Sequence, residues 1–286
     1  MKIRQTKIEH QRSLEQIADM LLLHGALTDC PGLVHGKMGI SIFFFHYAQY
    51  TGNKLFVDYA LELIVEIQEQ IHINSPADYE KGIAGIGVGI DYLIHNKLLI
   101  AEDDLCEDFD HRMYRAVMYD PWLDFSLYDG LTGYGKYWLM RLQWPTSNYK
   151  ARECLLRIIE LIVEKIPYFS EQEQVDVYCF LQDLQQIRDL DNFSRLLELS
   201  HKLNMQTIYI QRFGNSPYSN IISMYHRNHY FNVSLQDEID DALKKIPDLD
   251  LEKPPSSLGL LLGYSGEGLL RLTAHKKVNM SWMHLL

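Results

Sequence analysis

The sequence predicts an all-α protein, and three observations support this. A short phrase, Gly-x-x-Gly, opens an apolar segment four times along the 286 residues. Segments with the i, i+3, i+4, i+7 apolar spacing of amphipathic helices alternate with these apolar segments. Strand patterns are few, and the alternation at residues 207–210 is isolated, so it predicts at most a short β excursion. The architecture we expect is an α/α toroid (barrel) of about six helix pairs.

The glycine phrase recurs with a nearly constant period. Its glycine pairs are Gly36/Gly39, Gly82/Gly85, Gly130/Gly133 and Gly263/Gly266. The first three copies are spaced by 46 and 48 residues, and the fourth follows 133 residues later, close to three more periods. Such a period is typical of repeat proteins. Glycine is unfavourable inside a helix but permits close backbone approach or unusual φ at its start, so we expect these pairs to let neighbouring apolar helices pack closely.

A second set of helices, each charged on one face, is expected between the apolar ones. The predicted ranges are 8–23, 54–72, 102–119, 147–166, 190–203 and 234–246, with starts 43–48 residues apart. In the second range Leu63 and Ile67 lie on one face and Glu62 and Glu66 on the other. Helices with one charged face are expected on the outside, and the apolar helices are expected to be enclosed. The segments 173–188 and 217–231 keep a helical pattern without the glycine phrase. Residues 1–286 are expected to form one domain, with an open solenoid as the alternative.

Composition and charge restrict the partners. The net charge of −11 argues against nucleic acid and anionic membrane surfaces. The N-terminal residues are polar, unlike a signal peptide, and the apolar run near 39–45 is too short to span a bilayer, so a cytoplasmic location is expected. The four cysteines form no C-x-x-C pair, and disulfides are not expected. Three of them, Cys106, Cys154 and Cys179, fall in helical patterns and are interpreted as buried thiols.

The loops before the glycine phrases are rich in polar residues. These four rim loops are residues 27–36, 73–82, 120–130 and 253–263. Because each has the same place in its repeat, we expect all four at one rim of the toroid, with the N-termini of the apolar helices. Their partial positive charge would favour an anionic or carbonyl group there.

The phrases GLVHGKMGI, GIAGIGVGI and LLGYSGEGLL resemble the repeats of the lanthionine synthetase cyclase-like (LanC-like) family. That family is an α/α toroid whose inner helices begin with H-G-x-x-G or C-H-G-x-x-G phrases. Its lanthipeptide cyclases add a cysteine thiol to a dehydrated Ser or Thr. A zinc ion held by two cysteines and one histidine activates that thiol. The resemblance therefore implies a toroid in a peptide-modification pathway.

The sequence departs from the family at the metal ligands. Leu261 and Leu262 stand where the family has cysteine and histidine, and no W-C-x-G phrase occurs. Six helix pairs are visible where the family usually has seven. His35 alone matches an H-G-x-x-G phrase, in the first repeat. The resemblance thus implies a zinc-less, non-catalytic protein that binds a peptide or a maturation enzyme in a lanthipeptide-type or other peptide-modification pathway, and no metal or other cofactor is expected.

Candidate site residues come from the rim loops and the helix starts that follow them. The binding candidates are His35, Lys37, Glu80, Lys81, Tyr128, Asp129, Tyr134 and Tyr264, and the weak catalytic candidates are His35, Asp129 and Glu267. Structural roles are also open for some of them. Glu80 lies near a helix start and favours its dipole, Asp129 is a potential N-cap, and Lys37 and Lys81 are compatible with simple solvation.

Two enzymatic alternatives remain. One is a cyclase with an altered zinc site built from Cys30, His35 and either His226 or His229, since zinc requires three or four protein ligands. The other is a carbohydrate-active toroid, which uses two carboxylates about 5–10 Å apart. Its candidates are Glu80, Asp129 and Glu267, with Trp122, Tyr128, Tyr134 and Tyr264 as nearby aromatic residues. Nucleotide binding is not expected, because no P-loop phrase occurs.

Overall fold

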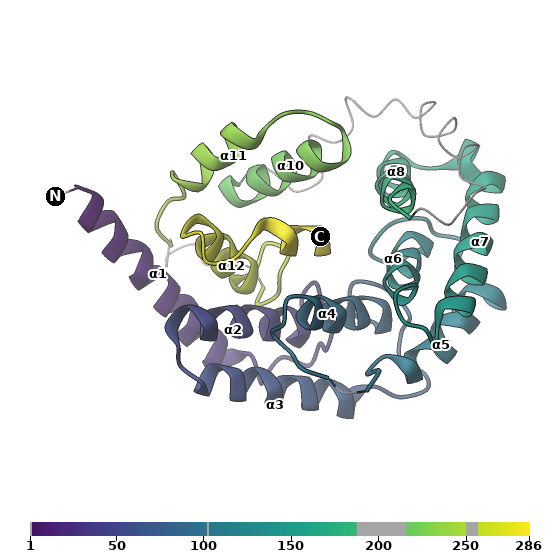
Figure 1. The fold of residues 1–286 in the computed structure, drawn as a ribbon, viewed down its shortest axis with the longest axis horizontal. Coiled ribbons are helices and arrows are strands. Elements are labelled where there is room, and N and C mark those ends of the chain that lie inside the picture. The colour runs from purple at the N-terminus through teal and green to yellow at the C-terminus, as the bar shows by residue number, and fades with distance from the viewer. Residues whose placement is uncertain (1, 102, 188–215, 250–256) are drawn as a thin grey trace. The chain divides into compact units, whose positions relative to one another are not determined.

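A computed structural model describes residues 2–101, 103–187, 216–249 and 257–286. Within these ranges the chain is helical apart from loops, and the β contact that it forms is an isolated bridge between Ser257 and Gly263 (Figure 1). The all-α prediction is confirmed. The predicted helix 190–203 and the strand-like residues 207–210 lie outside the described residues.

The amphipathic and apolar helices alternate along the chain as predicted. The amphipathic set is α1 (Lys2–His24), α3 (Leu55–Gln70), α5 (Glu107–Met118), α7 (Asn148–Lys165) and α11 (Gln236–Leu243). The apolar set is α2 (Lys37–Thr51), α4 (Ile83–His95), α6 (Leu131–Arg141), α8 (Glu171–Gln185), α10 (Pro217–Tyr230) and α12 (Tyr264–Ala274). Two short 3₁₀ helices, η1 (Ile166–Tyr168) and η3 (Met280–Leu285), complete the described elements. Since α5 begins at Glu107, Cys106 precedes the helix instead of lying within it.

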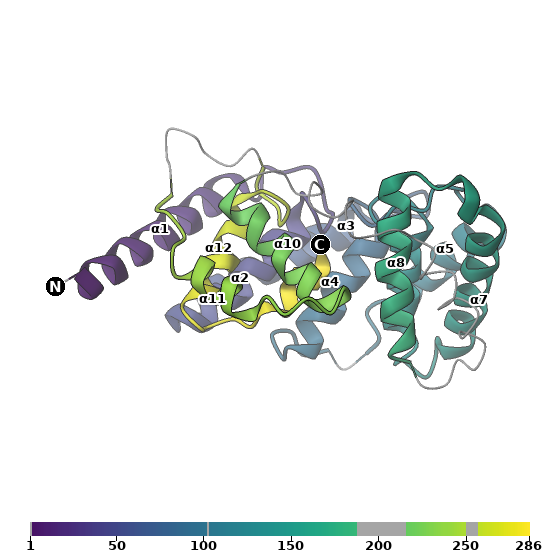
Figure 2. The same cartoon turned by 90° about the horizontal axis from the view of Figure 1, so that it is seen from above.

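Burial follows the two patterns. In α2 every residue from Lys37 to Ala48 is buried. In α3 Leu63 and Ile67 are buried, whereas Leu55 and Val65 are 70% and 52% exposed. The two helices pack against each other, side by side in Figure 1 and overlapping in the view from above in Figure 2. An enclosed helix thus has a one-sided helix beside it, as the periodicity indicated.

The described residues form two compact units. Unit 1 takes residues from Met1–His72, Tyr92–Ile100 and Gly214–Leu286, and unit 2 takes residues from Ile73–Asp91 and Ala101–Phe213. In unit 1, α2 packs on α3 and α12, and α12 also contacts α1 and α11. In unit 2, α6 packs on α7 and α8, and α5 packs on α7. The single domain expected for residues 1–286 stays a prediction.

A buried polar network holds the core of unit 2. The Arg141 guanidinium, 0% exposed, donates to Asp104 at 2.6 Å and to Asp110 at 2.8 Å. It also donates to Ser147, and Tyr137 donates to Asp110 at 2.7 Å. Burial alone would raise the pKa of Asp104, but the hydrogen bonds from Arg141 and from Cys106 N outweigh it, and the pKa is lowered. A paired charge of this kind stabilises only while every partner is present.

Four of the six described apolar helices end in a common way, whereas α6 and α8 do not. Residues in left-handed conformation follow α2, α4, α10 and α12, namely Gly52, Lys97, Asn232 and Lys276. At the last of these the N–H of Lys277 donates to Leu272 O at 3.0 Å, and after α4 the N–H of Leu98 donates to Leu93 O at 2.9 Å. These bonds satisfy carbonyl groups that have no partner inside the helix.

The thiols of Cys106, Cys154 and Cys179 are buried and not in disulfides, as predicted. None of the helices in the described part of the chain combines the length and the apolar composition that a membrane span requires.

Candidate functional site

Each glycine phrase forms a helix start that is capped by its own rim loop. In every copy, N–H groups of the first helical turn donate to loop carbonyls seven positions earlier in the chain. Lys37 N donates to Cys30 O at 2.9 Å, Ile83 N to Pro76 O at 2.9 Å, Leu131 N to Asp124 O at 2.8 Å and Tyr264 N to Ser257 O at 3.0 Å. The loops thereby supply the partners that the first turn of a helix lacks.

Steric constraint, more than unusual backbone torsion, explains the glycines. Gly36 and Gly130 have φ of −122° and −113° in the extended region, which any residue adopts. A Cβ at Gly36 would lie 2.3 Å from Cys30 O, and one at Gly130 would lie 2.3 Å from Asp124 O. A Cβ at Gly133 would lie 2.2 Å from Leu127 O. The glycine pairs therefore allow the loop to fold back on its own helix. The expected close approach of a neighbouring helix is also found, since a Cβ at Gly266 would lie 2.3 Å from the Tyr218 hydroxyl of α10.

A third glycine also lies at contacts between the apolar helices. Two positions after each pair ending in Gly85, Gly133 and Gly266 stand Gly87, Gly135 and Gly268. A Cβ at these positions would lie 2.6 Å from the Tyr137 ring, 2.4 Å from the Phe180 ring and 2.3 Å from the Phe43 ring, respectively. The phrase thus has two functions: its first two glycines admit the loop, and its third admits an aromatic ring from the next helix.

This capping argues against the expected anion site. The first N–H groups of α2, α4, α6 and α12 already donate to carbonyls of the loops, so an incoming anion would have to displace a loop. The expected N-cap role of Asp129 is also wrong, because Gly130 is the N-cap and no side chain bonds there.

The two helices without the glycine phrase are capped by serine. Ser170 and Glu173 form a capping box at α8, with Ser170 N donating to Glu173 at 2.8 Å. At α10, Ser216 accepts from Ser219 N at 3.0 Å and Pro217 occupies the first turn. Both signals are visible in the sequence as S-x-x-E and Ser-Pro, and they explain why these copies need no glycine pair.

Most of the predicted site residues in unit 1 are buried or pair with other residues of the fold. Lys37 is 4% exposed, and its Nζ lies 2.6 Å from Glu66 on α3, so the solvated role considered for it is wrong. Glu267 lies 2.8 Å from Arg271, which is 1% exposed. Tyr264 is buried. His35 is half-buried, and its backbone lies against Gly259 of another rim loop.

The candidates of unit 2 are brought together at two rim loops. Tyr128 O accepts from Tyr79 N at 2.9 Å and Glu80 N at 3.1 Å, which joins the loop 73–82 to the loop 120–130. Glu80 pairs with the exposed Lys81 at 3.4 Å. Asp129 is exposed beside them, and Tyr134 is buried.

Two further carboxylates complete a group that we call the rim carboxylates: Asp78, Glu80, Asp124 and Asp129. Asp78 accepts from Lys81 N at 2.7 Å, and Asp124 accepts from Ser126 N at 2.7 Å. Burial and the negative charges of Glu80, Asp78 and Asp124 raise the pKa of Asp129. Burial and the negative charges of Asp78, Asp124 and Asp129 raise the pKa of Tyr134 to about 12. Asp78 and Asp124 were missed from the sequence, although Asp and Asn commonly begin such turns.

An exposed apolar segment adjoins the rim carboxylates. In residues 119–124, which we call the apolar loop, Tyr119 is 76% exposed, Trp122 66% and Leu123 53%. Three large apolar side chains are thus exposed within five residues, and exposed apolar surface of this kind is a common feature of interaction sites. The arrangement combines negative charge with exposed aromatic surface.

The histidines considered as zinc ligands have other partners. His226 Nε2 lies 2.8 Å from Met283 O, and the rings of His229 and His284 lie 4.2 Å apart in an edge-to-face arrangement. Tyr225 hydroxyl lies 2.7 Å from His284 Nε2. Together these contacts anchor η3 on α10. Over the described ranges, no group of three or more His, Cys, Asp or Glu side chains is arranged to hold a metal ion.

Comparison with protein-family models found no match, and comparison with curated proteins found none. Function must therefore be argued from the site itself and from the resemblance of its repeats.

Proposed function

We propose that the chain is a zinc-less LanC-like α/α toroid that binds a peptide or a partner maturation enzyme in a lanthipeptide-type or other peptide-modification pathway, without catalysing a reaction itself. The observation that carries the proposal is the rim of unit 2, where four carboxylates adjoin an exposed apolar loop. The resemblance of the glycine phrases supplies the family, and Leu261 and Leu262 at the ligand positions argue against its zinc chemistry.

A contact that recurs between apolar helices supports the proposed closure of the ring. Gly87 of α4 receives Tyr137 of α6, and Gly135 of α6 receives Phe180 of α8. Gly268 of α12, the last apolar helix, receives Phe43 of α2, the first one. In an open solenoid each repeat contacts only its neighbours, so the first and last apolar helices would not form this contact with each other. The last and first repeats thus supply the kind of contact that a closed toroid requires.

The rim loops repeat a second contact in the same order. Leu261 N of the last loop donates to Val34 O of the first at 3.1 Å, just as Glu80 N donates to Tyr128 O at 3.1 Å in the second and third loops. Each of these four residues lies two positions before the first glycine of its phrase. This agreement in register also favours closure.

The occupant that we propose for the rim of unit 2 is a peptide segment with cationic and apolar side chains. Negative charge at Glu80 and Asp129 favours Lys or Arg on the ligand and speeds their encounter. Exposed Trp122 and Leu123 provide the apolar anchor, and Trp is over-represented among residues that dominate binding energy. The net charge of −11 disfavours an acidic partner.

Fluorescence anisotropy with labelled peptides tests this proposal. A peptide of alternating Leu and Lys should bind the full chain, and its Leu/Glu counterpart should not. Trp122→Ser should weaken binding about fivefold or more, because a buried anchor contributes over 1 kcal/mol. Tyr168→Ser, at an 82% exposed tyrosine on η1, is the matched control and should leave binding unchanged. Equal binding of both peptides, or equal effects of both substitutions, would overturn the proposal.

The metal content of the purified chain distinguishes the zinc-less protein that we propose from a cyclase with an altered zinc site. Plasma emission on the purified chain should find no stoichiometric metal. One zinc per chain that disappears in His35→Ala would instead establish a site that includes His35 and would reject the zinc-less proposal.

A carbohydrate-active enzyme is the second candidate, and the raised pKa of Asp129 beside Glu80 is the observation that favours it. A general acid requires a pKa that is shifted in this direction. A glycan panel compares the chain with Asp129→Asn. Hydrolysis that is lost in this variant would favour the enzyme, whereas an unchanged rate would dispose of it.

A further inference from the structure

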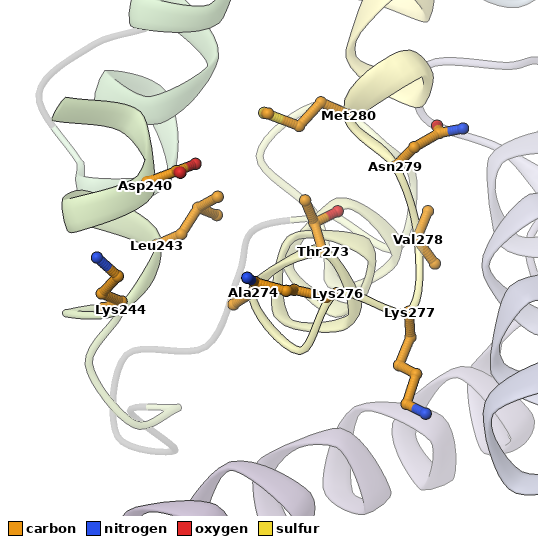
Figure 3. Close-up of a pocket in the computed structure, with 10 residues that line it drawn as sticks. All are labelled: Asp240, Leu243, Lys244, Thr273, Ala274, Lys276, Lys277, Val278, Asn279 and Met280. Carbon is orange, nitrogen blue, oxygen red and sulfur yellow. The ribbon is translucent and has the colours of Figure 1, made fainter. Parts of the chain in front are cut away.

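Unit 1 contains a cavity of about 500 Å³ that none of the sequence motifs predicted. It is lined by Asp240, Leu243 and Lys244 of α11, by Thr273 and Ala274 of α12, and by Lys276, Lys277, Val278, Asn279 and Met280 of the segment that follows (Figure 3). This volume lies within the range of about 300–1,000 Å³ that is usual for small-ligand sites.

The interior of the cavity is apolar. Leu243 and Val278 are buried, and Met280 is half-buried. Thr273 hydroxyl donates to Leu269 O at 2.8 Å and accepts from Trp282 at 3.0 Å. Both roles of this hydroxyl are therefore used inside the fold, and Thr273 presents its methyl group as further apolar surface. A ligand body without polar groups would suit these walls.

The charges around the mouth are mainly positive. Three lysines and one aspartate line the cavity, in a chain whose net charge is −11. Lys244 pairs with Asp241 at 2.9 Å, and Gln236 donates to Asp240 at 2.9 Å. Among the described residues, neither Lys276 nor Lys277 forms an ion pair. The Lys276 ammonium, which extends toward α11, therefore has its charge available for an anion in the cavity (Figure 3).

The backbone holds these lysines in place. Lys276 has φ of 57°, a left-handed conformation that a residue with a side chain adopts at a cost of about 1 kcal/mol. The bonds from Lys276 N to Thr273 O, at 2.8 Å, and from Lys277 N to Leu272 O, at 3.0 Å, fix the turn. In Figure 3 the Lys276 side chain extends toward α11, whereas the Lys277 side chain points away from it.

We propose that this cavity binds an apolar carboxylate, with the carboxylate at Lys276 and the apolar body against Leu243, Val278 and Met280. Asp240 disfavours a second negative charge on the α11 side, so a ligand with a single anionic end fits best. Two sources share this chemistry: a free carboxylic acid, and the C-terminal carboxylate of a peptide with an apolar last residue. This site is independent of the rim of unit 2.

The test uses the full chain labelled with ¹³C at the methionine methyl groups, with the Met280 signal assigned from Met280→Leu. N-acetyl-leucine and octanoate represent the two sources of carboxylate, and N-acetyl-leucinamide is the uncharged control. We expect at least one acid to shift the Met280 signal saturably while the amide does not. The acid that saturates at lower concentration identifies the source.

Matched lysine variants test the role of charge. Lys276→Gln should weaken acid binding about fivefold, the effect of losing one partly exposed ion pair. Lys97→Gln, at the left-handed residue after α4 that also has φ of 57°, keeps the same helix-end geometry away from the cavity and should change nothing. Absence of saturable shifts, equal shifts by acid and amide, or equal effects of the two substitutions would overturn the proposal and leave the lysines with only a helix-end role.

Discussion

Gly135 on α6 should be intolerant of any side chain because the Phe180 ring of α8 occupies that space. A Cβ added there would meet three ring atoms at 2.4, 2.6 and 3.1 Å, whereas ordinary van der Waals contact begins at 3.4 Å. Phe180 is fully buried, so the ring must move by about 1 Å into packed surroundings. Such overpacking costs about 1–3 kcal/mol, and the better helix propensity of alanine offsets about 1 kcal/mol of it.

A double-mutant cycle isolates the clash from the propensity. Gly135→Ala, Phe180→Leu and the double variant are unfolded in urea and followed by far-UV circular dichroism. Leucine removes the ring atoms that approach most closely, so alanine at 135 should become neutral or stabilising in that background. The expected coupling energy is about 1–3 kcal/mol in favour of the double variant. If the two substitutions add to within about 0.5 kcal/mol, the glycine–ring contact is not what holds α6 against α8, and our account of the third glycine is refuted.

Three further predictions concern stability. Arg141→Met should lower the free energy of unfolding by about 3–5 kcal/mol, because it leaves Asp110, 1% exposed, as an uncompensated buried charge; a loss below 1 kcal/mol would contradict this. The folded-state pKa of Asp104 lies below 3.8, so its contribution is present above that pH and lost as the pH falls through the folded-state value. Asp104→Asn should therefore flatten the acid limb of a stability–pH curve. Leu262 is 41% exposed with φ of 53°, so Leu262→Gly should stabilise by about 0.5–1 kcal/mol, whereas Leu261→Gly, where φ is not positive, should not.

Helix type and order were predictable because they depend on local periodicity. The contrast between enclosed α2 and one-sided α3 is visible in the spacing of their apolar residues, and it agrees with their burial. Boundaries were less accurate. The helix expected from residue 102 begins at Glu107, because Asp104 accepts from Cys106 N and the chain turns there first.

The candidate site was predictable in place but not in detail. Polar rim loops before the glycine phrases were visible, and Glu80, Lys81 and Asp129 do lie together in unit 2. Lys37, in contrast, is turned inward to Glu66 on α3, a partner that only packing could supply. The His229–His284 contact likewise joins residues more than fifty positions apart, for which no local pattern exists.

The sequence by itself determined that this protein is helical, that its repeats are marked by glycine pairs, and that cysteine and histidine are missing where the resembling family binds zinc. Each of these depends on residue type and spacing along the chain. The tertiary structure decided what the glycines are for, since only coordinates reveal a loop carbonyl about 2 Å from a missing Cβ. It also capped the first N–H groups of four apolar helices with loop carbonyls and placed three lysines among the residues that line a cavity. Both depend on distances between residues that the chain brings together only when it folds.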